Sequence, residues 1–181
     1  MEEITVIVYI ISTFFNLPDS KLIADRTQVV IRPKVQEIEI IQNDLFGLIT
    51  NEQDKKELLA FWQDLQQINP KKPPLAKELN NFQLKSFTIH QTDHKFQTHL
   101  VLKYSKLQDL RVLGIWYNTN KNLLSINEQP KEHIQTSSGK LDGNYWFFSA
   151  DNISSYTVEP FKEMPESYIR QKRTIEEILL D

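Results

Sequence analysis

Two of the four histidines, His90 and His99, fall on neighbouring strands of a predicted β-hairpin whose turn spans residues 92–95. If Gln91 pairs with Phe96 across that turn, the two histidines become diagonal neighbours on one face. Diagonal positions in an antiparallel pair lie about 7–8 Å apart at the backbone. Two imidazoles at that separation could share a metal ion.

The turn offers further polar groups to such a site. Asp93 or His94 could supply a third metal ligand, and an acid beside the histidines could assist hydrolysis. Exposed sheet faces carry the same residue types for solubility alone, and the sequence has no His-x-His or His-Glu-x-x-His spacing. A small metal-dependent or hydrolytic enzyme using His90, His99 and Asp93 is therefore the alternative hypothesis rather than the leading one.

Two carboxylates, Glu37 and Glu39, share one face of another predicted strand. Their spacing could suit acid–base chemistry or a divalent cation. A solvated strand face accounts for them equally well.

Consecutive aromatic residues occur at 116–117 and at 145–148. Because neighbouring residues of a strand point to opposite faces, some of these rings must lie outside the main core. Exposed aromatic rings anchor interfaces and form stacking platforms, unless a second layer such as the helix after residue 50 covers them. The predicted binding residues are Trp116, Tyr117, Tyr145, Trp146 and Phe148.

The hairpin that positions the histidines runs through Leu84–Gln91 and Phe96–Tyr104. In the register set by Gln91 and Phe96, Lys85 faces Leu102, and apolar and polar side chains separate onto two faces, as in an antiparallel sheet with one wet face. The predicted core face contains Phe87, Ile89, Phe96, Leu100 and Leu102.

Two helices are predicted to pack against the sheet. A capping box from Thr50 to Gln53 opens the first, at 50–68, and apolar residues then recur every three or four positions. The second is expected at 167–180, with its apolar stripe facing the core.

The remaining strands are predicted from β-branched and aromatic runs bounded by turn residues. They are expected at Thr27–Arg32, Val35–Ile41, Leu110–Tyr117, Asn122–Asn127, Tyr145–Ser149 and Tyr156–Glu159. The predicted fold class is α+β, with a mainly antiparallel sheet of about six or seven strands and two principal helices.

The 181 residues are expected to form one domain, with a proline-rich connection at 70–74 inside it. The apolar run at 5–15 is predicted to be a buried strand because it is β-branched and is preceded by Glu2 and Glu3 rather than by basic residues. The protein is accordingly expected in the cytoplasm without a transmembrane segment, and the alternative is that this run supports export or membrane-surface association.

Composition excludes several classes of function. The chain has no cysteine, so thiolate nucleophiles and zinc sites built on cysteine are absent, and only four glycines argue against phosphate-binding loops. A net charge of −3 disfavours non-specific nucleic-acid binding.

The leading hypothesis is a non-enzymatic module without a cofactor that binds another protein, such as a small acidic inhibitor or immunity-type protein. An apolar-ligand-binding protein is a further alternative to the enzyme.

Overall fold

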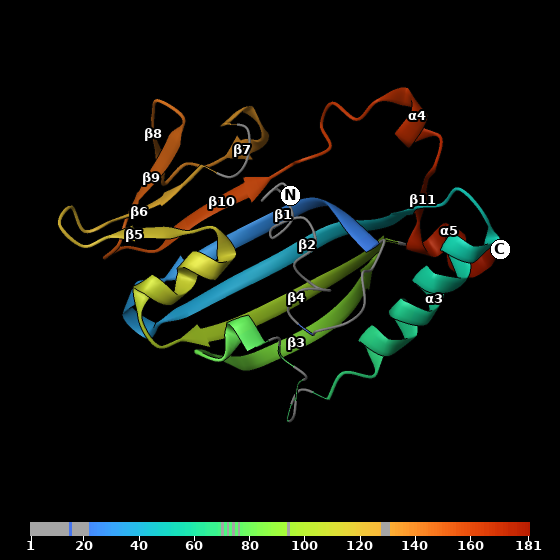
Figure 1. Cartoon of the computed structure of the whole chain (residues 1–181), viewed down its shortest axis with the longest axis horizontal. Coiled ribbons are helices and arrows are strands. Elements are labelled where there is room, and N and C mark those ends of the chain that lie inside the picture. Colours follow the sequence, from blue (N-terminus) through green and yellow to red (C-terminus); the bar gives the residue numbers. More distant parts are fainter. Residues whose placement is uncertain are drawn as a thin grey trace.

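The computed structural model describes Phe15 and residues 22–69, 71, 73, 75, 77–93, 95–127 and 131–181 (Figure 1). The strands among these residues form two sheets, and every strand pairing is antiparallel. Sheet A contains β1 (Leu22–Arg32), β2 (Glu37–Leu48), β3 (Phe82–Thr92), β4 (Lys95–Tyr104), β7 (Ile134–Gln135), β10 (Ser154–Val158) and β11 (Lys172–Thr174). Sheet B contains β5 (Trp116–Asn118), β6 (Leu123–Ile126), β8 (Lys140–Asp142) and β9 (Tyr145–Ser149).

Short helices and turns join these strands. The helices are α3 (Glu52–Gln66), α4 (Glu166–Ile169), α5 (Ile175–Leu180) and the 3-10 segments η1 (Pro33–Val35), η2 (Lys77–Leu79), η3 (Leu107–Leu113) and η4 (Lys131–His133). Sheet A has the order β3-β4-β2-β1-β10-β7, with β11 paired to the end of β2, and sheet B has the order β5-β6-β9-β8. The predicted α+β class with a mainly antiparallel sheet is confirmed, and sheet B is an addition that the sequence did not indicate.

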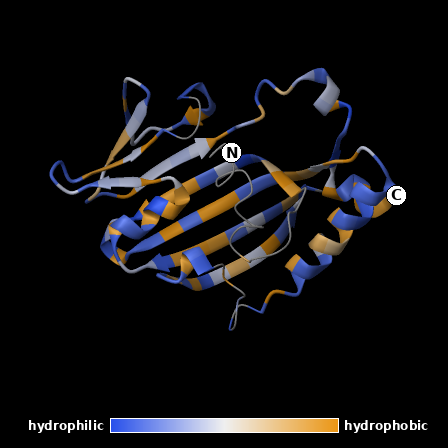
Figure 2. Cartoon of the chain, viewed as in Figure 1, coloured by the Kyte–Doolittle hydropathy of each residue, from blue (hydrophilic) through white to orange (hydrophobic). Residues whose placement is uncertain are grey.

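One hydrophobic core is shared by both sheets and α3. Along the long strands of sheet A, hydrophobic and hydrophilic residues alternate, and α3 presents an apolar stripe (Figure 2). The ring centroids of Trp62 in α3 and Phe96 in β4 are 4.8 Å apart, and those of Phe148 in sheet B and Tyr156 in sheet A are 5.6 Å apart. These contacts explain why one face of each sheet is dry while the other can carry polar or binding groups.

The predicted hairpin register is confirmed near the turn, where Gln91 pairs with Phe96 and His90 with Gln97. It is wrong at Lys85, because a bulge between Leu84 and Ser86 makes Leu84 the partner of Leu102. A bulge inserts one residue without a partner, so the core-facing positions change from Phe82 and Leu84 before it to Phe87 and Ile89 after it.

The first predicted helix is α3, but its N-cap is Asn51 rather than Thr50. The Asn51 side chain accepts hydrogen bonds from the backbone N–H groups of Gln53 and Asp54, at 2.9 and 3.0 Å. Asp54 reaches back to the Thr50 backbone N–H at 2.9 Å. Asp54 thus bonds the residue before the N-cap, and an Asn51 cap replaces the predicted capping box, since Asn is at least as good an N-cap as Thr and a carboxylate favours the first turn.

The predicted strand at 110–117 is mostly the 3-10 helix η3, and only β5 remains extended. Gly114, at φ 73°, ends η3 and returns its N–H to the Arg111 carbonyl at 3.0 Å. Both faces of this segment looked apolar because Leu110, Leu113 and Ile115 all enter the core around a helical turn.

The predicted helix at 167–180 is divided into α4, β11 and α5. Lys172–Thr174 pairs with Leu48–Phe46 of β2, and the Lys172 ammonium bonds the Asp25 carboxylate and lies 4.4 Å from the Phe46 ring centroid. Thr174 then caps α5 in a capping box with Glu177. The pairing to β2 outweighs the helical preference of the sequence around Lys172.

Most of the apolar run at 5–15 lies outside the described residues. Phe15 is the exception: it is buried, and its ring centroid is 4.9 Å from that of Phe87. Of the proline-rich connection, Pro70, Lys72 and Pro74 are likewise outside. No helix in the described part of the chain is long and apolar enough to cross a membrane.

Candidate functional site

The polar face of sheet A, defined here by Arg32, Glu39 and His99, carries the predicted histidines. His99 on β4 lies directly opposite Thr88 on β3, so His90 is its diagonal neighbour, as the sequence predicted. Asp93 stands in the exposed turn at φ 50°, and His94 is outside the described residues.

The two imidazoles bond to different partners. A ring nitrogen of His90 lies 2.8 Å from the Thr88 hydroxyl, whereas His99 Nε2 lies 2.7 Å from Glu39 Oε1. The other oxygen of Glu39 accepts from Arg32 at 2.5 Å. The backbone register therefore brings the histidines to one face, while hydrogen bonding directs His99 toward β2 and away from His90.

Glu39 is the electrostatic centre of this face, with its side chain 15% exposed. Burial by itself would raise the pKa of Glu39. Hydrogen bonds from Arg32 and His99, together with their positive charge, overcome that effect and hold the pKa below the ordinary value of about 4.5. Glu39 thus belongs to an ionic network across β1, β2 and β4, while Glu37 makes no ion pair among the described residues.

The chemistry available to this face is limited. A carboxylate that orients an imidazole is part of many nucleophilic sites, but such sites also need a nucleophile within hydrogen-bond reach of the imidazole. The hydroxyl of Thr88, opposite His99, is bonded to His90 instead. Within the described ranges, no group of three or more His, Asp or Glu side chains is placed to hold a metal ion.

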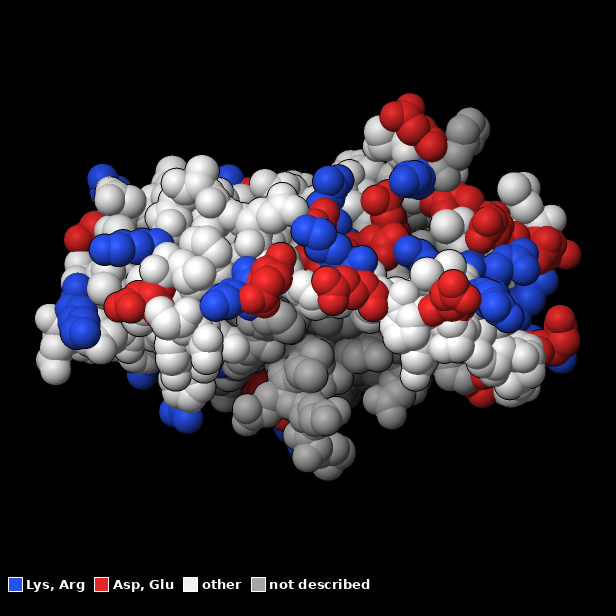
Figure 3. Space-filling model, turned by 90° about the horizontal axis from the view of Figure 1, so that it is seen from above, with Lys and Arg blue, Asp and Glu red and all other residues white. Residues whose placement is uncertain are grey.

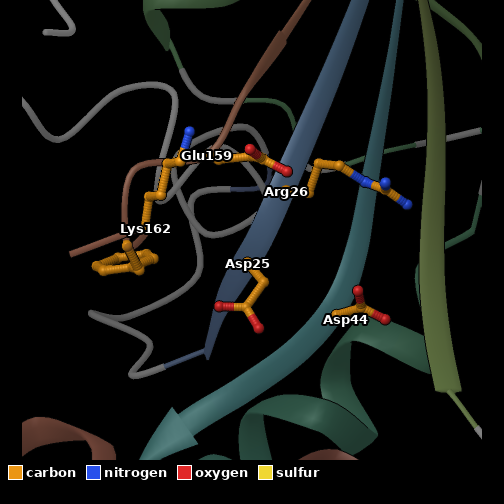
Figure 4. Close-up of a pocket in the computed structure, with 6 residues that line it drawn as sticks. Asp25, Arg26, Asp44, Glu159 and Lys162 are labelled. Atoms are coloured by element: carbon orange, nitrogen blue, oxygen red, sulfur yellow. The ribbon is translucent and has the colours of Figure 1, made fainter. Parts of the chain in front are cut away.

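A second polar location is a charged cleft of about 280 Å³, where β1 and β2 change the face that they bury (Figure 4). Ala24 and Thr27 are both buried although three residues apart, and Asp44 on the paired strand has φ 53°. Such an irregularity re-aims side chains into a crevice. The residues lining the cleft are Asp25, Arg26, Asp44, Glu159, Phe161 and Lys162.

The acids of this charged cleft do not converge. Their carboxylates lie well apart in Figure 4. Asp25 is paired with Lys172, Asp44 lies 3.1 Å from Lys95, and Glu159 accepts from Gln135 at 2.8 Å. Because the three acids already bond to separate partners, they do not form a common binding point for a ligand.

The aromatic face of sheet B, defined here by Trp116, Tyr145 and Phe147, is different. Trp116 pairs with Ser125, and Ser125 with Phe147, so these side chains project from the same side of the sheet. Tyr145 is two residues from Phe147 on β9, and their rings stack at 6.0 Å with an interplanar angle of 27°.

These rings face solvent rather than the core. Trp116 is 40% exposed and Tyr145 is 44% exposed, and the Arg111 guanidinium lies 4.4 Å above the Trp116 ring. On the opposite side of sheet B, Leu124, Ile126 and Phe148 are buried. Sheet B thus has one side that completes the core and one that presents rings.

The predicted binding residues divide between the two sides of sheet B. Trp116 and Tyr145 lie on the aromatic face, whereas Tyr117, Trp146 and Phe148 lie on the side that meets the core. Phe147 was not among the predicted binding residues. The alternation along β9 could have paired it with Tyr145, but it could not tell which pair faces the core.

Comparisons with known proteins add no relative: no protein-family model matches the chain, and neither the curated proteins nor the solved structures contain a match.

Proposed function

We propose that this chain is a non-enzymatic binding protein and that the aromatic face holds a protein partner. The observation that carries the proposal is that Trp116, Tyr145 and Phe147 project together from one exposed side of sheet B. Contiguous exposed apolar groups are uncommon on monomers and mark interaction sites.

The composition of this face matches the centre of a protein interface. Trp, Tyr and Arg are the residues most enriched at positions that dominate binding energy, and Arg111 lies over Trp116. Lys140 and Asp142 of β8 lie opposite Phe147 and Tyr145, so charged residues border the rings, as they do at the rim of a protein interface. In the view from above, charged side chains gather toward the end of the molecule with α5 and are sparser toward the end with sheet B (Figure 3).

The contrast with the polar face of sheet A also supports binding rather than catalysis. There, the side chains that could take part in catalysis already bond to one another, at 2.5 Å between Arg32 and Glu39 and 2.7 Å between His99 and Glu39. On the aromatic face, a partner would bury exposed rings, and this burial would stabilise the complex by about 25 cal/mol per Å² of apolar surface.

Quantitative affinity capture from the source cell, followed by measurement with the purified partner, tests the proposal. The double variant W116A/F147A should lose a partner that the wild-type chain retains, and the dissociation constant should rise about 30-fold or more, as for an interface hot spot. The matched control is Ile169→Ala, since Ile169 is 55% exposed and lies on α4.

Circular dichroism and thermal unfolding should show that all the variants fold. A partner captured equally by the wild type, Ile169→Ala and the double variant would contradict the proposal. Loss of the partner with both W116A/F147A and Ile169→Ala would also contradict the proposal, because it would indicate non-specific adhesion.

A further inference from the structure

A separate cleft, here called the end cleft, lies between two turns at one end of sheet A. One turn contains η1 and joins β1 to β2, and the other joins β9 to β10. Pairing of Ile31 with Ser154 brings these turns side by side. The cleft has a volume of about 510 Å³, within the range of small-molecule sites.

Hydrogen bonds hold the η1 side of the end cleft in place. Gln36 has φ 55° and donates its N–H to the Pro33 carbonyl at 3.1 Å. The side-chain amide of Gln36 donates to the Ser105 carbonyl at 2.7 Å, which ties this turn to the end of β4.

The other side is held equally well. The Asp151 backbone N–H donates to the Ser149 hydroxyl at 3.2 Å, and the Asp151 carboxylate accepts from the Asn122 side chain at 2.6 Å. A cleft between two anchored turns is formed before any ligand arrives, so binding would not have to order it.

The end cleft is apolar in the middle. Val35 from one turn is 51% exposed and Ile153 from the other is 66% exposed, and both line the cleft. Pro33 adds a further apolar surface. These side chains would lose contact with water if a hydrocarbon chain lay between the turns.

One cation at the edge of the end cleft is left to pair with an anion. Lys34 makes no ion pair with any acid among the described residues, whereas Arg32 is paired with Glu39 at 2.5 Å. Asp151 contributes one negative charge, and its carboxylate accepts a hydrogen bond from the Asn122 side chain. An anionic ligand in the end cleft would therefore pair with Lys34.

We propose that the end cleft binds a small amphiphilic carboxylate, with its hydrocarbon chain against Val35 and Ile153 and its carboxylate beside Lys34. This site is separate from the aromatic face, because Trp116, Tyr145 and Phe147 are not among the residues that line the end cleft. It gives the chain a second binding activity, for a small molecule rather than a protein.

Titration of the ¹⁵N-labelled full chain with sodium octanoate, followed by amide NMR, tests the site. The amides of residues 34–35 and 151–153 should shift together as octanoate is added. Octan-1-ol has the same hydrocarbon chain without the charge, so it should bind at the same amides about three- to tenfold more weakly, the effect of one partly exposed ion pair.

Charge variants then separate the two parts of the interaction. Lys34→Glu should weaken octanoate binding by about three- to tenfold and leave octan-1-ol unchanged, and Asp151→Asn should tighten octanoate binding. Ile153→Ser should weaken both ligands. Lys85→Glu, on exposed β3, is the matched charge control and should change neither.

Three outcomes would overturn the proposal: equal affinity for octanoate and octan-1-ol, insensitivity of octanoate binding to Lys34→Glu, or shifts spread across other surfaces. W116A/F147A should leave the octanoate titration unchanged. Failure of the end cleft and failure of the aromatic face are therefore distinguishable.

Discussion

The polar face of sheet A and the aromatic face of sheet B are both exposed sides of antiparallel sheets, yet they are completed to different degrees. On sheet A, Arg32, Glu39 and His99 satisfy one another across three strands. On sheet B, Trp116 and Tyr145 remain 40% and 44% exposed. Residues that look reactive in a sequence can be internally satisfied, whereas rings that look like core can be the groups still available to a partner.

The largest expected effect comes from substituting adjacent residues on the two sides of β9. Phe148→Ala should lower the free energy of unfolding by about 3–5 kcal/mol, because a buried ring leaves a cavity beside Tyr156. Phe147→Ala should cost less, about 1–2 kcal/mol, since Phe147 is half-buried on the aromatic face and stacks on Tyr145. Urea unfolding measures both.

The assignment of the two sides of sheet B depends on that difference. Similar losses for the two variants would mean that the aromatic face is covered rather than exposed. Leu124→Ala, on the core side of neighbouring β6, provides a second measure of what burial on this sheet contributes.

Glu39→Gln should break the ionic network of the polar face. At pH 7 the variant should be less stable by roughly 1 kcal/mol, because Arg32 and His99 lose a charged acceptor. The pKa of Glu39 is lowered in the folded chain, so its contribution is complete above about pH 4.5 and is lost as the pH falls through the folded value. Wild type and variant should therefore converge as the pH falls below about 4.5 and through the folded pKa of Glu39.

Denaturant unfolding between pH 3 and pH 8 measures this convergence. Glu37→Gln is the matched control, since Glu37 lies two residues away on the same strand and makes no ion pair among the described residues. A pH-independent gap between wild type and Glu39→Gln would contradict the ionic explanation.

The hairpin around His90 and His99 shows how far sequence reasoning can go. Turn residues and strict alternation determined the register near Gln91 and Phe96, because a slip of one residue would expose the whole apolar set. The bulge at Lys85 does leave a mark in the pattern, because the core-facing residues change from the even positions of Phe82 and Leu84 to the odd positions of Phe87 and Ile89. The register extended from Gln91 and Phe96 did not take that change into account.

The segments at 107–118 and 166–180 show where local patterns fail. The η3 segment resembled a strand because its apolar residues include Val112, which is 40% exposed, beside the buried Leu110 and Leu113. The sequence alone does not show which of them face the core. The extended geometry of Lys172–Thr174 depends on β2 and Asp25, which are more than 120 residues away in the sequence. Non-local pairing of this kind overrides helical propensity.

The candidate binding face was predictable only in part. Consecutive aromatic residues at 145–148 required rings on both sides of a strand, and the alternation separated Tyr145 and Phe147 from Trp146 and Phe148. Which pair faces solvent depends on where Tyr156 of sheet A lies, and that is a property of packing between sheets.

A polar group without a partner does occur on sheet A, but inside the core rather than on its polar face. The Tyr104 hydroxyl at the end of β4 is buried and has no hydrogen-bond partner among the described residues. Tyr104→Phe should raise the free energy of unfolding by about 0.5–1 kcal/mol, because the cost of burying that hydroxyl disappears.

The pH dependence of Tyr104 has the opposite direction from that of Glu39. Burial raises the pKa of Tyr104 from 10 to about 12, so the unfolded chain ionises first and wild-type stability falls as the pH rises above 10. The advantage of Tyr104→Phe over wild type should therefore grow between pH 10 and 12 in denaturant unfolding. A gap that shrinks over this interval would mean that the pKa of Tyr104 is lower in the folded chain than in the unfolded chain, as when a nearby cation stabilises the phenolate.

The smallest expected effect is that of His90→Ala, and it bears most directly on the enzyme hypothesis. His90 is exposed and bonds only to Thr88 among the described residues, so its loss should change the free energy of unfolding by less than about 0.5 kcal/mol. His99→Ala should cost more, because it leaves Glu39 with Arg32 alone. If the two histidines instead shared a metal ion, both variants should lose the same metal and the same stability. Elemental analysis of untagged protein together with both unfolding curves decides between these outcomes. Because His90 bonds to Thr88 and His99 bonds to Glu39, the two variants should lose unequal amounts of stability.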